Sequence, residues 1–188
     1  MAVLPIMIMG DSVLHSPASP VESVTDDIRA LVNDMFETMD AAPGVGLAAP
    51  QVGVPLRLFV YSYQDDEGAP WRGVVINPEL WMHPLEPGMP DPDEESEGCL
   101  SFPGERFALR RSSRVRVTGT DLEGDPVSID VDGWRARILQ HEYDHLDGIL
   151  YIDRLDDGDW KTVQKLARKR GWGRQGHSWM PGVDDLDA

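Results

Sequence analysis

Apolar residues recur at three- and four-residue spacing in the first quarter of the chain. They lie at Ile28, Leu31, Val32, Met35, Phe36 and Met39. On an α-helix this spacing gathers the side chains on one face, so the pattern predicts an amphipathic helix. Thr25 is a suitable N-cap residue, and Asp26 and Asp27 follow in the first turn, where negative charge suits the helix dipole. We therefore predict a helix from Thr25 to about Asp40.

The middle of the chain has the patterns of strands and turns. Residues 56–63 and 73–76 are apolar-rich runs, which predict two buried strands. Residues 114–120 and 127–131 alternate polar and apolar side chains around a short turn-forming sequence, so they predict a hairpin. Residues 81–92 are rich in proline and predict an irregular surface loop.

Two more helices are predicted towards the C-terminus, over residues 134–147 and 159–170. Residues 171–188 are rich in Gly, Pro and Asp and offer little to a core, although their tryptophans can pack back on the body. The order helix, strands, helix predicts an α+β fold with mainly antiparallel sheet packed on the central helix 134–147. We expect a single domain, residues 1–170, and a C-terminal tail, residues 171–188.

Composition narrows the class of protein. The 188 residues are 41% hydrophobic and 27% charged, which suits one compact domain. The apolar stretch at residues 2–9 is too short to span a bilayer and lacks the features of a secretory signal. The single cysteine, Cys99, cannot form an internal disulfide, which favours a reducing compartment. We therefore expect a cytoplasmic protein with no membrane partner.

The segment Gln140-His-Glu-Tyr-Asp-His145 carries the sharpest chemical signal. Residues four apart lie on one helix face, about 6 Å apart along the axis, so His141 and His145 can bind one metal ion. Glu142 follows the first histidine and can act as general base towards a water on that ion. The alternative is an exposed helix with two unrelated histidines, which is disfavoured because the chain has only five.

Two imidazoles do not complete a hydrolytic metal site, which commonly has three protein ligands and one position open to water. Downstream candidates for the third ligand are Asp153, Asp156, Asp157, Asp159 and His177. Upstream, Cys99 stands in Glu97-Gly-Cys-Leu-Ser101, where Gly98 lets the backbone approach closely. A lone cysteine is often only a small buried hydrophobe. Paired with the histidine helix, it becomes a credible thiolate ligand.

A third segment, Gly44-Val-Gly-Leu-Ala-Ala-Pro-Gln51, lets a main chain bend sharply or pass close to a ligand. It is neither a dinucleotide fingerprint nor a phosphate loop, because the third glycine and the Gly-Lys-Ser/Thr sequence are missing. Alone it is compatible with a plain turn.

Together the three segments resemble peptide deformylases. The motifs of that family are Gly-φ-Gly-φ-Ala-Ala-x-Gln, Glu-Gly-Cys-φ-Ser and Gln-His-Glu-x-Asp-His, where φ is apolar. Residues 44–51, 97–101 and 140–145 match them in order and without a departure. The resemblance implies a metal-dependent hydrolase that removes the formyl group from the N-terminal formyl-methionine of nascent polypeptides and releases formate. The proline-rich stretch before the second motif and the tail differ from a minimal member.

The resemblance also implies the roles of individual residues. The metal ligands would be Cys99, His141 and His145, the catalytic acid–base would be Glu142, and Gln51 with the backbone N–H of Leu100 would form the oxyanion site. Arg111 would pair with Glu97 to hold the cysteine segment, Gln140 would support the site, and Asp144 is a candidate partner for a ligand histidine.

The formyl peptide is expected to lie extended beside residues 44–47 as an added strand. Its methionine side chain would enter an apolar pocket near Val45, Leu100 and Ile138, so Val45, Gly46 and Ile138 are the candidate substrate-binding residues. Plain core packing is the alternative interpretation for Val45 and Ile138.

One thiolate and two imidazoles suit zinc, ferrous iron, nickel or cobalt as the single divalent ion. The family resemblance points to ferrous iron. A zinc endopeptidase is an alternative, but it would leave Cys99 and the glycine segment without a role. A non-catalytic metal-binding domain is another, and it would need neither Glu142 nor Gln51.

Charge is distributed unevenly along the chain. The formal net charge of −16 disfavours contact with nucleic acid, whereas residues 161–174 carry six basic residues and no acid. We therefore predict that the basic segment Lys161–Arg174 forms a surface that binds the phosphate-rich ribosome, where nascent peptides emerge. A basic helix that only offsets nearby acidic residues is the equal alternative.

Overall fold

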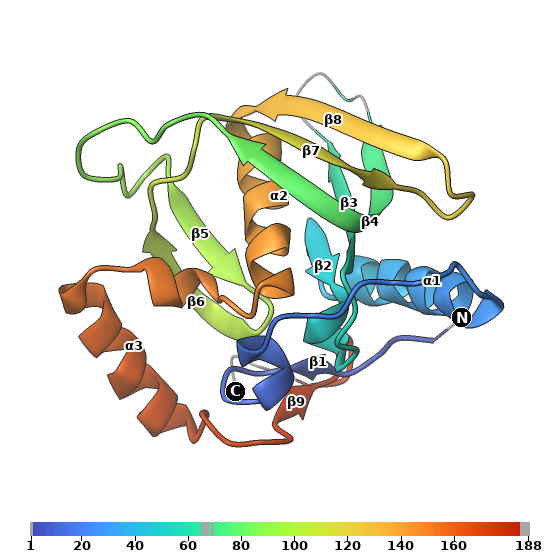
Figure 1. Cartoon of the computed structure of the whole chain (residues 1–188). Helices are drawn as coiled ribbons and strands as arrows, with labels where there is room; N and C mark the ends of the chain where they lie inside the picture. The colour runs from blue at the N-terminus through green and yellow to red at the C-terminus, as the bar shows by residue number, and fades with distance from the viewer. Residues whose placement is uncertain (1, 65–67, 69, 185–188) are drawn as a thin grey trace.

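A five-stranded antiparallel sheet forms the frame of the protein, seen in the computed structural model in Figure 1. The structure describes residues 2–64, 68 and 70–184. The strand order is β2-β3-β4-β7-β8. The strands span Gly46–Ala48 (β2), Leu58–Gln64 (β3), Pro70–Met82 (β4), Arg114–Thr120 (β7) and Pro126–Asp132 (β8). The three α-helices of the described chain are Asp26–Ala41 (α1), Gly133–Leu146 (α2) and Asp157–Arg170 (α3).

Both faces of this sheet are covered, which is clearest along β3. Successive side chains of a strand point to opposite faces. Leu58 and Val60 pack in the apolar cluster that includes α1, whereas Phe59 and Tyr61 pack in the cluster with α2. All four are buried, which explains why the sequence of β3 is continuously apolar instead of alternating.

The predicted α+β fold is confirmed, with mainly antiparallel sheet around a central helix. The first helix starts at the predicted N-cap, because the Thr25 side chain accepts a hydrogen bond from the Ile28 N–H. The hairpin β7–β8 and helices α2 and α3 also lie where the sequence placed them, within two residues at each end.

The extent of β4 was predicted wrongly. The sequence indicated a strand at residues 73–76 and a loop from residue 81, but β4 runs from Pro70 to Met82. It pairs with β3 in its first half and with β7 in its second, with a register shift between Ile76 and Glu79. Asn77 lies in this bulge with φ of 50°, and its side chain bonds both backbone groups of Val21. A bulge held by such a distant contact has no local sequence pattern.

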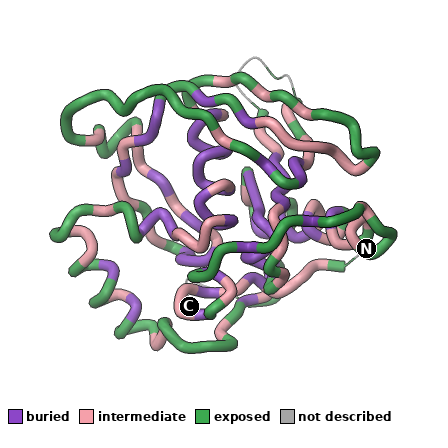
Figure 2. The backbone as a smooth tube through the Cα atoms, in the orientation of Figure 1, coloured by how far each residue is buried: buried purple, intermediate pink, exposed green. Residues whose placement is uncertain are grey.

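Helix α2 runs through the centre of the molecule, and Figure 2 shows most of it buried. Its buried residues include apolar Ala136 and Leu139 but also the polar Gln140, Glu142 and Asp144. Polar groups avoid such positions unless partners satisfy them. Their burial therefore marks this helix as the element that carries the chemistry.

Two small sheets complete the fold around α2. Ser96–Cys99 (β5) and Phe102–Ala108 (β6) form a hairpin that the sequence did not predict. Ile6–Met7 (β1) pairs with Ser178–Trp179 (β9), which joins the two ends of the chain.

The C-terminal segment contributes more than the sequence indicated. Trp179 is buried in the main apolar cluster, and Trp172 packs edge-on against Phe102. The expected packing of the tryptophans on the body is confirmed, and in the described part of residues 171–188, which ends at residue 184, it contributes more to the core than expected. Among the described residues, no helix is long and apolar enough to cross a bilayer.

Candidate active site

Three potential ligand side chains converge where α2 meets the end of β5. His145 Nε2 lies 3.2 Å from His141 Nε2 and 3.3 Å from Cys99 Sγ. Cys99, His141 and His145 are all buried, and in the described chain they are the only group of such side chains placed to share an ion. The third-ligand alternatives Asp153 and His177 do not join them.

These distances fit one ion at the centre of the group. Tetrahedral bonds of about 2.1 Å to nitrogen and 2.3 Å to sulfur place the ligand atoms roughly 3.4–3.6 Å apart. The observed separations are within a few tenths of an ångström of that range. The donor set of one thiolate and two imidazoles suits a single first-row divalent ion.

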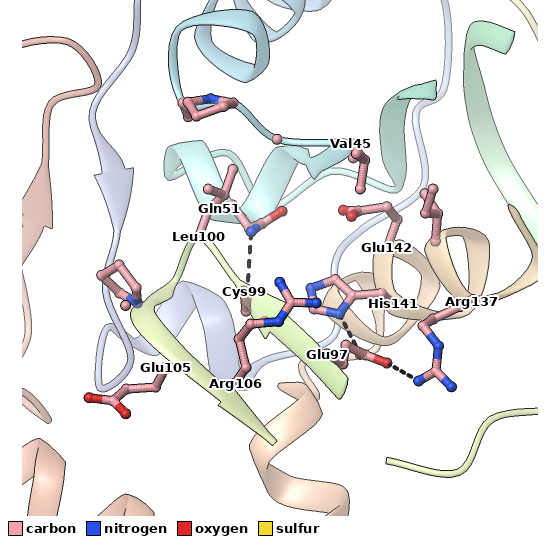
Figure 3. A pocket seen from close by; sticks show the side chains of 18 of the residues that line it. Val45, Gln51, Glu97, Cys99, Leu100, Glu105, Arg106, Arg137, His141 and Glu142 are labelled. Atoms are coloured by element: carbon pink, nitrogen blue, oxygen red, sulfur yellow. Dashed lines mark hydrogen bonds and ion pairs between the residues drawn. The ribbon is translucent and has the colours of Figure 1, made fainter. Parts of the chain in front are cut away.

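Glu97 orients the first histidine from behind. One of its carboxylate oxygens accepts a hydrogen bond of 2.6 Å from His141 Nδ1, which leaves Nε2 free to face the cysteine. The same carboxylate is paired with Arg111 at 2.6 Å and with Arg137 at 2.9 Å, and all three side chains are at most 9% exposed. Figure 3 shows Glu97 between His141 and Arg137. The predicted Arg111–Glu97 pair is confirmed.

Asp144 does not contact a ligand histidine, contrary to the prediction. Its carboxylate binds Arg111 at 2.5 Å and Arg154 through two further hydrogen bonds. It therefore supports the site through Arg111, which is shared with Glu97. Gln140, which was expected to support the site, bonds both the N–H and the carbonyl of Ser112 through its amide and ties α2 to the segment before β7.

The pKa values of Glu97 and His145 are shifted strongly from their ordinary values. Burial alone would raise the pKa of Glu97, but the hydrogen bond from His141 and the charge of Arg111 hold it well below its usual range. Burial and the neighbouring His141 lower the pKa of His145, which favours the neutral ring that metal binding requires.

Glu142 lies beside the three potential ligands without being one of them. It is 3% exposed, burial raises its pKa to about 7, and its Oε2 has no hydrogen-bond partner in the described part of the structure. A carboxyl with a pKa near neutrality and a free oxygen suits proton transfer. Any larger residue at position 46 would displace the Glu142 side chain, because a Cβ atom there would lie 2.2 Å from Glu142 Oε1.

Gln51 faces the cysteine from the 3₁₀ helix Ala49–Val52. Its Oε1 accepts a hydrogen bond of 2.8 Å from Ala48 N–H, which fixes the amide orientation. Its Nε2 is then directed at Cys99 Sγ, 3.8 Å away, and at Ser101 Oγ, 3.4 Å away. The amide group therefore presents N–H donors to the place where the three potential ligands meet.

A cavity of about 530 Å³ opens in front of these groups. Figure 3 shows Val45, Leu100, Gln51, Cys99, His141 and Glu142 around this cavity. Ile138 also lines it, although it is only 3% exposed. The remaining wall includes Arg106 and, from the C-terminal segment, Trp179. The sequence analysis did not select either residue, since neither belongs to a local pattern.

A buried group of one cysteine and two histidines beside an ionisable glutamate and an amide donor, at the base of a cavity, defines a metal-dependent hydrolase. The comparisons with known proteins narrow this class. Residues 3–160 match the polypeptide deformylase family. The peptide deformylase of Mycolicibacterium smegmatis is 52% identical in an alignment that covers 97% of this chain and 96% of that protein.

Solved structures agree with this match. The Ehrlichia chaffeensis peptide deformylase in complex with actinonin superimposes with a TM-score of 0.77 at 37% identity, covering 90% of this chain and 98% of that one. The Met-Ala-Ser-bound enzyme of Acinetobacter baumannii gives 0.70 at 34%, covering 81% and 98%. The chain belongs to the peptide deformylase family, metal-dependent enzymes that remove the formyl group from the N-terminal formyl-methionine of nascent polypeptides.

Proposed function

We propose that this chain performs the deformylase reaction with Glu142 as the catalytic acid–base and with Cys99, His141 and His145 as the metal ligands. The observation that carries the proposal is the convergence of Cys99, His141 and His145 on one point, with Cys99, His141 and Glu142 lining the cavity. When bound, a divalent ion acts as a Lewis acid and makes water a nucleophile at neutral pH.

The residues around the proposed ion site transfer the proton and stabilise the negative charge of the reaction. Glu142 takes the proton of the attacking water and later delivers it to the leaving amine. Negative charge develops on the formyl oxygen, where the Gln51 amide and the Leu100 N–H donate hydrogen bonds. Burial of the site strengthens these contacts, because water does not compete with them. Formate and a free N-terminus are the products.

The activity is tested by formate release from a formyl-Met-Ala-Ser peptide, with cleavage of an internal peptide bond followed in parallel. A deformylase releases formate and leaves the internal bonds intact. A zinc endopeptidase would cut the chain internally, and a non-catalytic metal-binding domain would do neither. We propose ferrous iron as the resident ion, with zinc, nickel or cobalt as the alternatives that a metal analysis of anaerobically purified protein distinguishes.

The substrate is proposed to lie along β2 as an added strand. Within the described chain β2 is an edge strand, paired only with β3. Its first residue, Gly46, lines the cavity together with the preceding Val45. A free strand edge offers backbone groups to an extended peptide. The Acinetobacter baumannii relative is described as bound to Met-Ala-Ser, a peptide of the kind expected here.

Val45 is 39% exposed and is proposed to contact the methionine side chain beside Ile138. Val45→Trp is expected to raise the KM for formyl-Met peptides about tenfold, because the larger ring fills the entrance of the pocket. The kcat should change much less. Steady-state kinetics measures both values, and an unchanged KM would remove Val45 from the pocket.

The protein is proposed to be cytoplasmic. Its basic segment, Lys161–Arg174, is proposed to contact the ribosome. Lys161, Lys165, Arg168 and Lys169 are exposed on α3, while Val163 and Ala167 face the core. None of the four exposed side chains forms an ion pair with another described residue. This arrangement favours contact with phosphate over the alternative of local charge balance.

Triple replacement of Lys165, Arg168 and Lys169 by glutamate is expected to weaken ribosome binding strongly at low salt, because each lost phosphate contact lowers the affinity. Sedimentation with ribosomes measures the bound fraction. Deformylation of a short free peptide is the control and should be unchanged. Equal sedimentation of variant and wild type would reject the contact.

A further inference from the structure

The loop between β5 and β6, which contains Leu100 and Ser101, is held from both ends of the chain. Met9 N–H donates a hydrogen bond of 2.9 Å to the Ser101 carbonyl. The indole N–H of Trp179 donates one of 2.8 Å to the Leu100 carbonyl. Two successive carbonyls next to Cys99 are thus fixed by residues far away in the sequence.

The Trp179 contact reaches the cysteine through a single rigid unit. The Leu100 carbonyl and the Ser101 N–H belong to the same planar peptide group. The Ser101 N–H points at Cys99 Sγ, 3.3 Å away. Fixing the carbonyl therefore fixes the direction of the N–H that hydrogen-bonds the sulfur. It also restrains the adjoining peptide group, which carries the Leu100 N–H proposed to bind the formyl oxygen.

Trp179 is itself firmly placed. Its side chain is 8% exposed and packs in the main apolar cluster, and strand β9 pairs with β1. The preceding residues are anchored by Asp11, which is 5% exposed and accepts hydrogen bonds from Gly176 N–H and the Gln175 amide. An indole held this way can orient a backbone group without following its motion.

We propose that Trp179 is a positioning residue of the active site, which orients the Leu100–Ser101 peptide group towards the Cys99 sulfur and the substrate oxygen. Through Trp179, the C-terminal segment thereby contributes to the geometry of the active site. The expected effect of Trp179 on turnover rests on the proposed function. Its expected effect on the hydrogen bond to the Cys99 sulfur does not.

The test compares Trp179→Phe with Trp172→Phe. Both changes remove an indole N–H from the same segment, and both leave an aromatic ring in the core. Trp172 packs on Phe102 and does not line the cavity. If Phe at position 179 packs poorly, 3-benzothienylalanine at that position keeps the shape of tryptophan and has no N–H donor.

Loss of the indole donor is expected to lower kcat about fivefold, the worth of one ordinary hydrogen bond, with KM changed less than about twofold. In the cobalt-substituted protein without substrate, the sulfur-to-cobalt charge-transfer band should move to longer wavelength, because a less well hydrogen-bonded thiolate donates its electrons more readily. Trp172→Phe should change neither value.

The inference is overturned if the Trp179 variants keep the wild-type kcat and the wild-type cobalt spectrum. It is also overturned if Trp172→Phe produces the same changes, since the effect would then be general loosening of the segment. Absence of formate release by the wild type would instead refute the proposed function, and the cobalt spectrum would still decide whether Trp179 acts on the sulfur.

Discussion

Glu142→Gln protein is expected to bind its metal ion normally and to lose formate release by a factor of about 10²–10⁴, the usual contribution of a general acid–base. Glutamine has the size of glutamate, so it fits the narrow space against Gly46, but it cannot accept the proton of the attacking water. Because Glu142 is not a ligand, the metal should remain. Metal content and formate release, measured on the same sample, give the two values.

Cys99→Ala is the matched control for this experiment. It removes a proposed ligand and leaves the proposed acid–base in place, so metal content should fall together with activity. The two variants thereby separate binding from chemistry. Near-normal turnover by Glu142→Gln would show that another group carries the proton, and loss of metal from it would show that the carboxylate is a ligand.

Glu97→Gln is expected to weaken both the fold and the metal site. The Glu97 carboxylate faces two buried guanidinium groups, those of Arg111 and Arg137, and breaking such a buried pair costs on the order of 3 kcal/mol in the free energy of unfolding. The hydrogen bond to His141 becomes weaker because its acceptor loses the negative charge, which should lower the metal affinity about 10–100-fold, as for other residues that orient a ligand histidine. Urea unfolding of the metal-free protein and metal titration measure these effects.

Glu95→Gln is the control for this change, because Glu95 is two residues away and also binds arginine. Its pair with Arg110, at 2.7 Å, is partly exposed, with side chains 19% and 24% accessible to water. Its contact with Arg137 is longer, 3.6 Å, than the 2.9 Å pair between Arg137 and Glu97. A pair of this kind contributes at most about 1 kcal/mol, and Glu95 does not contact His141. Equal loss of stability in both variants would contradict the central place of Glu97.

The pH dependence of the Glu97 contribution has a definite sign. The pKa of this carboxyl is lowered in the folded protein, so its stabilising effect is present above the ordinary pKa of a glutamate and is lost as the pH falls below it. The difference in stability between wild type and Glu97→Gln should therefore shrink in acid.

The sequence alone determined the helices and the identities of the chemical groups. Helix α1 follows from its apolar spacing and its Thr25 cap, and the helical spacing of His141 and His145 already places both rings on one face. These features depend on residues within one or two turns of each other. The full length of strand β4 and the hairpin β5–β6 were not predicted from the sequence. Their limits depend on pairing partners and, for β4, on a bulge fixed by Val21, and not on a local pattern.

Only the tertiary structure decided how the site is assembled and supported. Cys99 joins the histidines across more than 40 residues of chain, Glu97 instead of Asp144 holds His141, and Trp179 reaches the cysteine loop from the C-terminal segment. These contacts arise because buried polar groups take whichever partner the packed fold brings within hydrogen-bond distance. A sequence shows which groups are present, whereas their choice of partner depends on the positions of strands and helices that meet only after folding.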